Sequence, residues 1–256
     1  MAAALLSPEQ LSGVYEKLKR AEESIGDLNS QIVAFLRERP EGGFSHDKQK
    51  AAQEFAEFHA KHTIPLRFGV IAGEVIHHLR SSLEHVAWML SSAEYREKHP
   101  RWIGFPIFTV DPFATGDKDK IASYDRQVKG ILDNGAVAAL DLIKGLQPYK
   151  AANPADDPLA ILHELNNEDK HHTLILIVAP WKGTLDISML RSFTISSFNT
   201  QKEWLDSVAA QPKLELSPYI AFAQIGRWKG EAVIPTLAEL TNKVSIIVKR
   251  FSELTI

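Results

Sequence analysis

Apolar residues recur every three or four positions over three long stretches, and this spacing predicts amphipathic helices. The first helix begins at Ser7-Pro8-Glu9, where a capping hydroxyl precedes a proline and an acid, and it ends before Pro40. The second covers residues 68–91 and the third covers 231–252. The stripe of the second helix is the most regular and consists of Ala72, Val75, Ile76, Leu79, Leu83, Val86 and Leu90.

Shorter elements fill the intervals between these helices. Within the ambiguous stretch 44–66, a helix is expected from about 47 to 61. Proline argues against a helix at 105–108, which predicts a packed loop or short strand there. A helix over 119–146 is expected to break or weaken at Gly135, and another short helix begins near 156–158.

The pattern changes after residue 173, where short runs rich in β-branched residues predict strands. These runs cover 174–178, 185–189, 191–198 and 213–225. Pro218 places part of the last run at a sheet edge, since proline cannot donate a ladder hydrogen bond.

The predicted fold class is therefore α+β, a mainly helical bundle with a small antiparallel sheet in its C-terminal half. Residues 1–172 form the helical part, 173–225 the strand-rich part and 231–252 the closing helix. Neither an internal repeat nor a linker interrupts the pattern, so residues 1–256 are expected to form a single domain.

Composition narrows the chemistry further. A formal charge of -3 and a pI near 6.4 mean that any nucleic-acid binding must use a local patch. The chain has no cysteine, which excludes disulfides, thiol nucleophiles and thiolate metal ligands. No run approaches the roughly 18 apolar residues of a membrane span, and the N-terminus has no basic signal region. The expected location is the cytoplasm, without membrane association.

The polar face of the 68–91 helix holds the first candidate site. His77, Arg80, Glu84 and His85 lie opposite the apolar stripe. Histidine transfers protons near neutral pH and arginine clamps phosphate, a combination that suits phosphodiester cleavage without a metal. Arg80 and His85 are about 140° apart around an ideal helix, so they flank this face. The alternative is a solvated polar face with incidental histidines.

The second candidate site lies within residues 163–172, where Leu159 and Leu165 belong to a stripe that continues to Asp169. A carboxylate aimed at the interior needs a partner. Arg80 or a histidine of residues 77–85 could supply one, which predicts that Asp169 or His171 lies beside that helix. In the alternative, the helix ends near Asn167 and Asp169 caps the following turn.

Motifs for metal and cofactor chemistry are missing. The zinc-protease spacing fails because Asn167 stands where His163-Glu164 would require a second histidine. Neither a P-loop nor a dinucleotide-binding glycine turn nor a nucleophile elbow occurs. No cofactor and no metal site is therefore expected, although His, Asp and Glu side chains leave metal binding open as an alternative.

Four motifs occur in a fixed order: residues 78–85, Phe105-Pro106-Ile107, Leu146-Gln147-Pro148-Tyr149 and Asp169-Lys170-His171. In this order they resemble a group of uncharacterised bacterial proteins that share a His-x-Leu-Arg-Ser-x-Leu-Asp/Glu-His element. The resemblance covers about 100 residues. It implies a common fold and brings no activity with it.

A more distant resemblance is to HEPN domains, whose hallmark is an arginine, four to six residues, and a histidine. Arg80 and His85 match with four residues between them. The resemblance implies metal-independent RNA cleavage at a composite site of a homodimer, with Arg80 on the phosphate and His85 as general acid or base. The strand-rich segment departs from a purely helical HEPN domain.

The leading hypothesis is that the chain is a HEPN-like ribonuclease or RNA-binding protein that acts as a toxin or a defence component. His77, Glu84, Asp169 and His171 would support Arg80 and His85 by orienting them or balancing charge. The alternative is a non-catalytic module whose polar helix face binds a partner or a small ligand.

Overall fold

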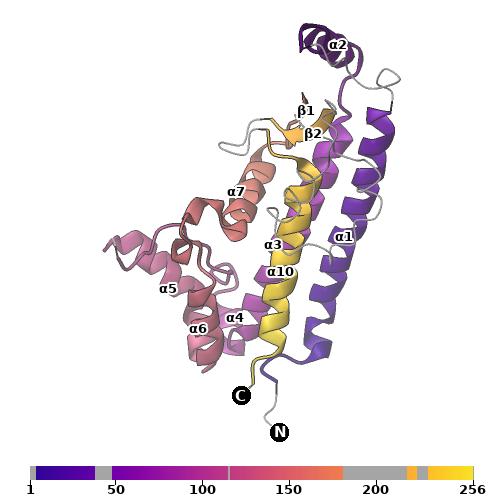
Figure 1. The fold of residues 1–256 in the computed structure, drawn as a ribbon. Coiled ribbons are helices and arrows are strands. Elements are labelled where there is room, and N and C mark those ends of the chain that lie inside the picture. The colour runs from indigo at the N-terminus through magenta and orange to yellow at the C-terminus, as the bar shows by residue number, and fades with distance from the viewer. Residues whose placement is uncertain (1–3, 38–47, 115, 181–217, 224–229, 256) are drawn as a thin grey trace. The chain divides into compact units, whose positions relative to one another are not determined.

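The computed structural model describes residues 4–37, 48–114, 116–180, 218–223 and 230–255 (Figure 1). These residues are mostly helical, with one two-stranded antiparallel sheet in the C-terminal half. The helices are α1 (Pro8–Leu36), α2 (Lys48–Lys61), α3 (Leu66–Leu90), α4 (Ala93–Lys98), α5 (Lys118–Asp133), α6 (Val137–Gly145), η1 (Pro148–Lys150), η2 (Pro154–Asp156), α7 (Pro158–His171) and α10 (Val233–Ser252). The strands are β1 (Leu176–Pro180) and β2 (Pro218–Phe222).

The α+β prediction is confirmed. The helix predicted over 68–91 is continuous from Leu66 to Leu90, and its central Leu79 and Leu83 have no exposed surface. The apolar stripe therefore does face the interior, as its 3.6-residue period requires. The residues opposite this stripe must lie either at the surface or under another segment.

The helix predicted over 119–146 is two helices. Gly135 adopts a φ of +70°, a left-handed conformation that glycine reaches without steric cost. The Asn134 side chain next to it donates a hydrogen bond of 3.0 Å to the carbonyl of Leu90, the last residue of α3. The break between α5 and α6 thus anchors the end of α3.

The short helix predicted to begin near 156–158 extends beyond Asn167, where one of the two alternatives had it end. It continues to His171, so Asp169 lies within α7 and does not cap a turn after Asn167. Of the predicted strands, the first extends from Leu176 to Pro180 and the last is confined to Pro218–Phe222. The predicted strands 185–189 and 191–198 lie outside the described residues.

The chain groups into two compact units, which are described separately. Unit 1 comprises residues 1–21, 76–167 and 243–256. Within it, the segments of α1, α3 and α10 run side by side, and α4, α5 and α6 lie together (Figure 1). A bridge between Ala4 and Thr255 joins the two ends of the described chain.

Unit 2 comprises residues 22–75 and 168–242. Its sheet pairs β1 with β2 in a register that sets Val178 opposite Ile220, and both of these side chains are buried. The ring of Phe35 lies edge-on to the rings of Phe58 and Phe68, at centroid distances of 6.0 and 5.9 Å. These aromatic contacts hold α2 against α1 and α3 within the unit.

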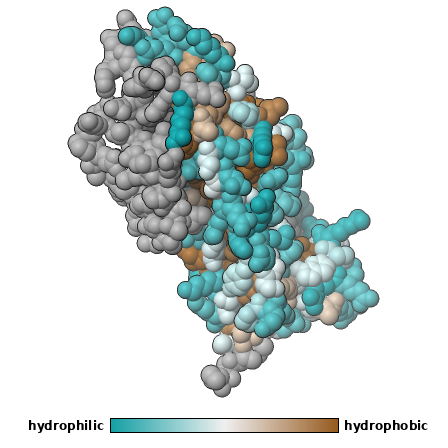
Figure 2. All heavy atoms as spheres, turned by 90° about the vertical axis from the view of Figure 1, so that its right-hand side faces the viewer, coloured by the Kyte–Doolittle hydropathy of each residue, from teal (hydrophilic) through white to brown (hydrophobic). Residues whose placement is uncertain are grey.

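The side of the molecule on which α1 lies is predominantly hydrophilic over its described part (Figure 2). Among the described residues, no helix combines the length and the apolar character that a bilayer crossing needs.

Candidate functional site

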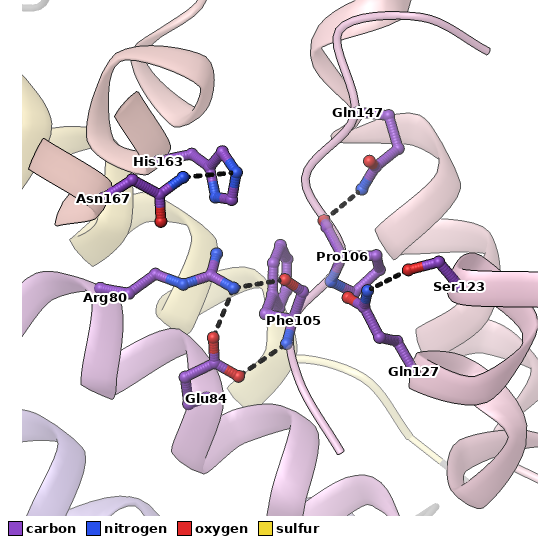
Figure 3. Close-up of polar contacts among 9 residues, drawn as sticks. All are labelled: Arg80, Glu84, Phe105, Pro106, Ser123, Gln127, Gln147, His163 and Asn167. Carbon is purple, nitrogen blue, oxygen red and sulfur yellow. Dashed lines mark hydrogen bonds and ion pairs between the residues drawn. The ribbon is translucent and has the colours of Figure 1, made fainter. Parts of the chain in front are cut away.

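Arg80 and Glu84 lie one turn apart on α3 and grip the backbone of Phe105 between them (Figure 3). Arg80 Nη2 forms an ion pair with Glu84 Oε1 and donates a hydrogen bond of 2.9 Å to the carbonyl of Phe105. The backbone N–H of Phe105 donates one of 2.9 Å to Glu84 Oε2. Both backbone groups of this buried residue are thus satisfied by side chains of one helix.

A buried glutamine binds the backbone of the residues that follow Phe105. Gln147 Nε2 donates to the carbonyl of Pro106 at 2.8 Å and to that of Ile143 at 3.1 Å. The backbone N–H of Phe108 donates to Gln147 Oε1 at 3.1 Å. Because residues 105–108 form neither helix nor strand, these side chains replace the backbone ladder that regular structure would provide.

At Gly104 the loop also packs closely against side chains of α3 and α5. A Cβ added at this glycine would lie 3.1 Å from Glu84 Oε2 and 3.8 Å from Gln127 Oε1. Gln127 in turn donates to Ser123 Oγ at 3.3 Å on α5 (Figure 3). The absence of a side chain at Gly104 therefore lets the loop come close to α3.

The guanidinium of Arg80 is almost fully enclosed. Burial lowers the pKa of Arg80, and the carboxylate of Glu84 opposes this shift, so the arginine stays charged. Its Nη1 atom is buried without a hydrogen-bond partner and points toward His163 and Asn167 of α7 (Figure 3). Asn167 Nδ2 and His163 Nε2 are themselves 3.1 Å apart. The guanidinium thus lies between the α3 carboxylate and a polar pair on α7.

His85 has a different environment, since its side chain is exposed. Partial burial lowers the pKa of His85, the ammonium of Lys17 on α1 lowers it further, and Glu84 opposes both effects. The lowered pKa favours the neutral imidazole, which is able to accept a proton. His77 and Trp88 are also exposed, and with Ser81 and His85 they follow one face of α3.

These four residues, His77, Ser81, His85 and Trp88, are called the outer stripe below. Arg80 lies on one flank of the helix and His85 on the other, about 140° away. Within one chain Arg80 is directed at Phe105, whereas His85 is influenced by Lys17. The structure therefore gives the two residues of the arginine–histidine pattern separate surroundings.

Asp169 lies against α3 at Gly73, one turn before His77. A Cβ added at Gly73 would be 2.7 Å from Asp169 Cγ, which shows how closely the carboxyl group packs on the helix backbone. The carboxylate paired with Arg80 is Glu84. His171 is exposed at the last residue of α7.

Three participants were not singled out from the sequence as site residues. Gln147 is almost fully buried. Its place between the apolar residues Leu146 and Pro148 was the available sign that this polar side chain lies in the interior. Gly73 is located seven residues before Arg80, at a helix position where glycine costs about 1 kcal/mol relative to alanine. Lys17 carried no local signal, because its effect on His85 depends on packing between distant helices.

Comparison with known proteins found no matching family model, curated protein or solved structure. Within the described part of the chain, no three His, Asp or Glu side chains are grouped so that they could hold a metal ion. The function is therefore inferred from the residues and their arrangement.

Proposed function

We propose that this protein binds single-stranded RNA through the outer stripe of α3. The observation that carries the proposal is the exposed row of His77, His85 and Trp88 on one face of a rigid helix. An exposed indole can stack on any base, and histidines can donate hydrogen bonds to phosphate oxygens. The charge of Lys17, which acts on His85 against that of Glu84, contributes positive charge near the outer stripe of this acidic chain.

Binding is favoured over cleavage because of what surrounds Arg80. Its Nη2 atom is engaged by Glu84 and Phe105, and the guanidinium is enclosed. A phosphodiester would have to displace these partners to reach the planar fork that makes arginine an effective phosphate clamp. In this arrangement Arg80 stabilises the loop at 104–108.

Metal-independent RNA cleavage is the second candidate, and the state of His85 favours it. An exposed imidazole with a lowered pKa has the properties of a general base. A composite site would bring His85 to an arginine of a second copy, as the HEPN resemblance implies for a homodimer. With such an activity, the protein would act as a toxin or a defence component.

Fluorescence anisotropy with a fluorescein-labelled 12-nucleotide single-stranded RNA, in low salt and excess chelator, tests binding. Trp88→Ala should weaken the affinity by roughly 5- to 150-fold, the loss of about 1–3 kcal/mol of stacking. Phe113→Ala is the matched control, since Phe113 is also an exposed aromatic residue. Equal affinities of Trp88→Ala, Phe113→Ala and the wild type would refute binding through the outer stripe.

The same RNA, separated on a denaturing gel, tests cleavage. Cleavage in excess chelator that is lost in folded His85→Ala and reduced in Arg80→Lys would establish the second candidate. Binding without cleavage would leave the non-catalytic function. Cleavage that disappears when divalent ions are removed would contradict the arginine–histidine mechanism.

A further inference from the structure

Three aromatic rings form a ladder from the core of unit 1 to its surface, along α4 and the turn that follows it. Tyr95 is buried at one end, and its hydroxyl donates a hydrogen bond of 2.7 Å to the carbonyl of Arg126. The Tyr95 ring lies 5.0 Å from the ring of His99. The His99 ring lies 4.3 Å from that of Trp102, with an interplanar angle of only 1°.

The last ring of this ladder is open to solvent. Trp102 is 47% exposed although His99 covers one of its faces. Nearly half of the residue therefore stays accessible beside the stacked imidazole. A parallel stack that ends in a partly exposed indole offers the position that a further planar ring would occupy.

The ladder is held rigidly before any ligand arrives. Ser92 caps α4 by accepting a hydrogen bond from the backbone N–H of Tyr95, and His99 and Trp102 are joined by a backbone hydrogen bond of 3.0 Å. Arg80 and Glu84 fix the chain at Phe105, three residues beyond Trp102. A preformed platform loses little conformational entropy when it binds.

The charges around the ladder indicate what kind of ring would stack there. Residues 93–102 contain three permanent cations, Arg96, Lys98 and Arg101, against two carboxylates, Glu94 and Glu97. Lys98 is paired with Glu94, whereas Arg101, directly before Trp102, is exposed. This local excess of positive charge in an acidic protein complements a phosphate chain.

We propose that the exposed indole of Trp102 is a stacking site for an unpaired nucleobase of single-stranded RNA, with Arg101 next to the adjoining phosphate. This inference rests on the proposed RNA-binding function and adds a second contact to that of the outer stripe. Because stacking reads no hydrogen-bond pattern, the site accepts any base.

The test uses the full chain and the same 12-nucleotide RNA, now carrying the fluorescent base 2-aminopurine at successive positions. Because the site accepts any base, stacking on Trp102 should quench 2-aminopurine at each position that can reach the indole. Trp102→Ala should abolish that quenching and weaken binding by roughly 5- to 150-fold. Trp102→Phe should retain most of the affinity, and Phe113→Ala should behave as the wild type.

The outcomes separate the two proposals. If Trp88→Ala weakens binding while Trp102→Ala changes neither affinity nor quenching, the stacking site is refuted and the proposed function stands. If the reverse holds, the platform at Trp102 is the RNA contact and the outer stripe is not. A folded wild type that neither binds the RNA nor quenches 2-aminopurine overturns both.

Discussion

The two flanks of α3 carry similar polar residues and differ in what covers them. On one flank, residues 104–108 cover Arg80 and Glu84, and both side chains are hydrogen-bonded to the backbone of Phe105. On the other, His85 remains exposed, and the charges of Lys17 and Glu84 act on it in opposite directions. A position off the apolar stripe is therefore no guarantee of a solvated or reactive side chain. Whether another segment folds over it decides its role.

The largest expected effect is on the covered flank. Arg80→Met keeps much of the side-chain volume but leaves the Phe105 carbonyl without its donor and the Glu84 carboxylate without its cation. Breaking a buried pair costs about 3–5 kcal/mol. Since the Glu84 side chain is 34% exposed, we expect a loss of about 2–3 kcal/mol in the free energy of unfolding, measured in urea.

A double-mutant cycle sharpens this expectation. Arg80→Met combined with Glu84→Gln removes the uncompensated carboxylate and keeps an acceptor for the Phe105 N–H. The double variant should therefore be less destabilised than the sum of the two single variants. A loss below about 0.5 kcal/mol for Arg80→Met would instead mean that the pair contributes no more than a surface ion pair.

The next effect concerns the close packing of α3 before the polar face begins. Gly73→Ala would place a methyl group 2.7 Å from Asp169 Cγ, so the carboxyl group or α7 must move. Overpacking of this kind costs about 1–3 kcal/mol. Gly26→Ala on α1 is the matched control, because nothing lies within 4 Å of its added methyl. It should stabilise by up to about 1 kcal/mol. Equal urea midpoints would show that Asp169 does not need the space at Gly73.

Periodicity was sufficient for the helices, because burial of an apolar stripe is a local property of the sequence. It gave α3 with Leu79 and Leu83 buried and the closing helix α10. The glycine at position 135 indicated the break between α5 and α6, which is likewise a local property. It could not give the partners of Arg80, since the bond to Phe105 spans 25 residues of sequence.

The ordered motifs carried more information than their separate chemistry suggested. Residues 78–85, 105–107 and 146–149 meet because Arg80, Glu84 and Gln147 bind the backbone of one loop. The fourth motif meets α3 elsewhere, where Asp169 packs on Gly73. The motif residues are thus accounted for in large part by the support of a segment that has no regular structure. The RNA contact that we propose therefore involves the exposed residues beside them.

A small effect is expected on the uncovered flank. His85→Ala and His77→Ala should each change the free energy of unfolding by less than about 0.5 kcal/mol, since both side chains are exposed. Urea unfolding beside Arg80→Met makes the comparison direct. If His85→Ala proved as costly as Arg80→Met, the two flanks would be equivalent structural surfaces and the contrast would fail.

The smallest effect is the response of His85 to pH. Burial and Lys17 hold the pKa of His85 below its ordinary value of about 6.5, so the unfolded chain takes up the proton first as the pH falls. Above the unfolded pKa, His85 adds no pH dependence to stability. Below it, stability falls until the folded pKa is passed and then levels off. His85→Gln should remove this contribution to the pH profile of the urea midpoint.

Lys17→Gln should raise the pKa of His85, followed through its imidazole proton resonance in an NMR titration. If the pKa of His85 is the same in Lys17→Gln as in the wild type, the charge of Lys17 does not act on His85. The positive charge proposed near the outer stripe would then not reach this residue.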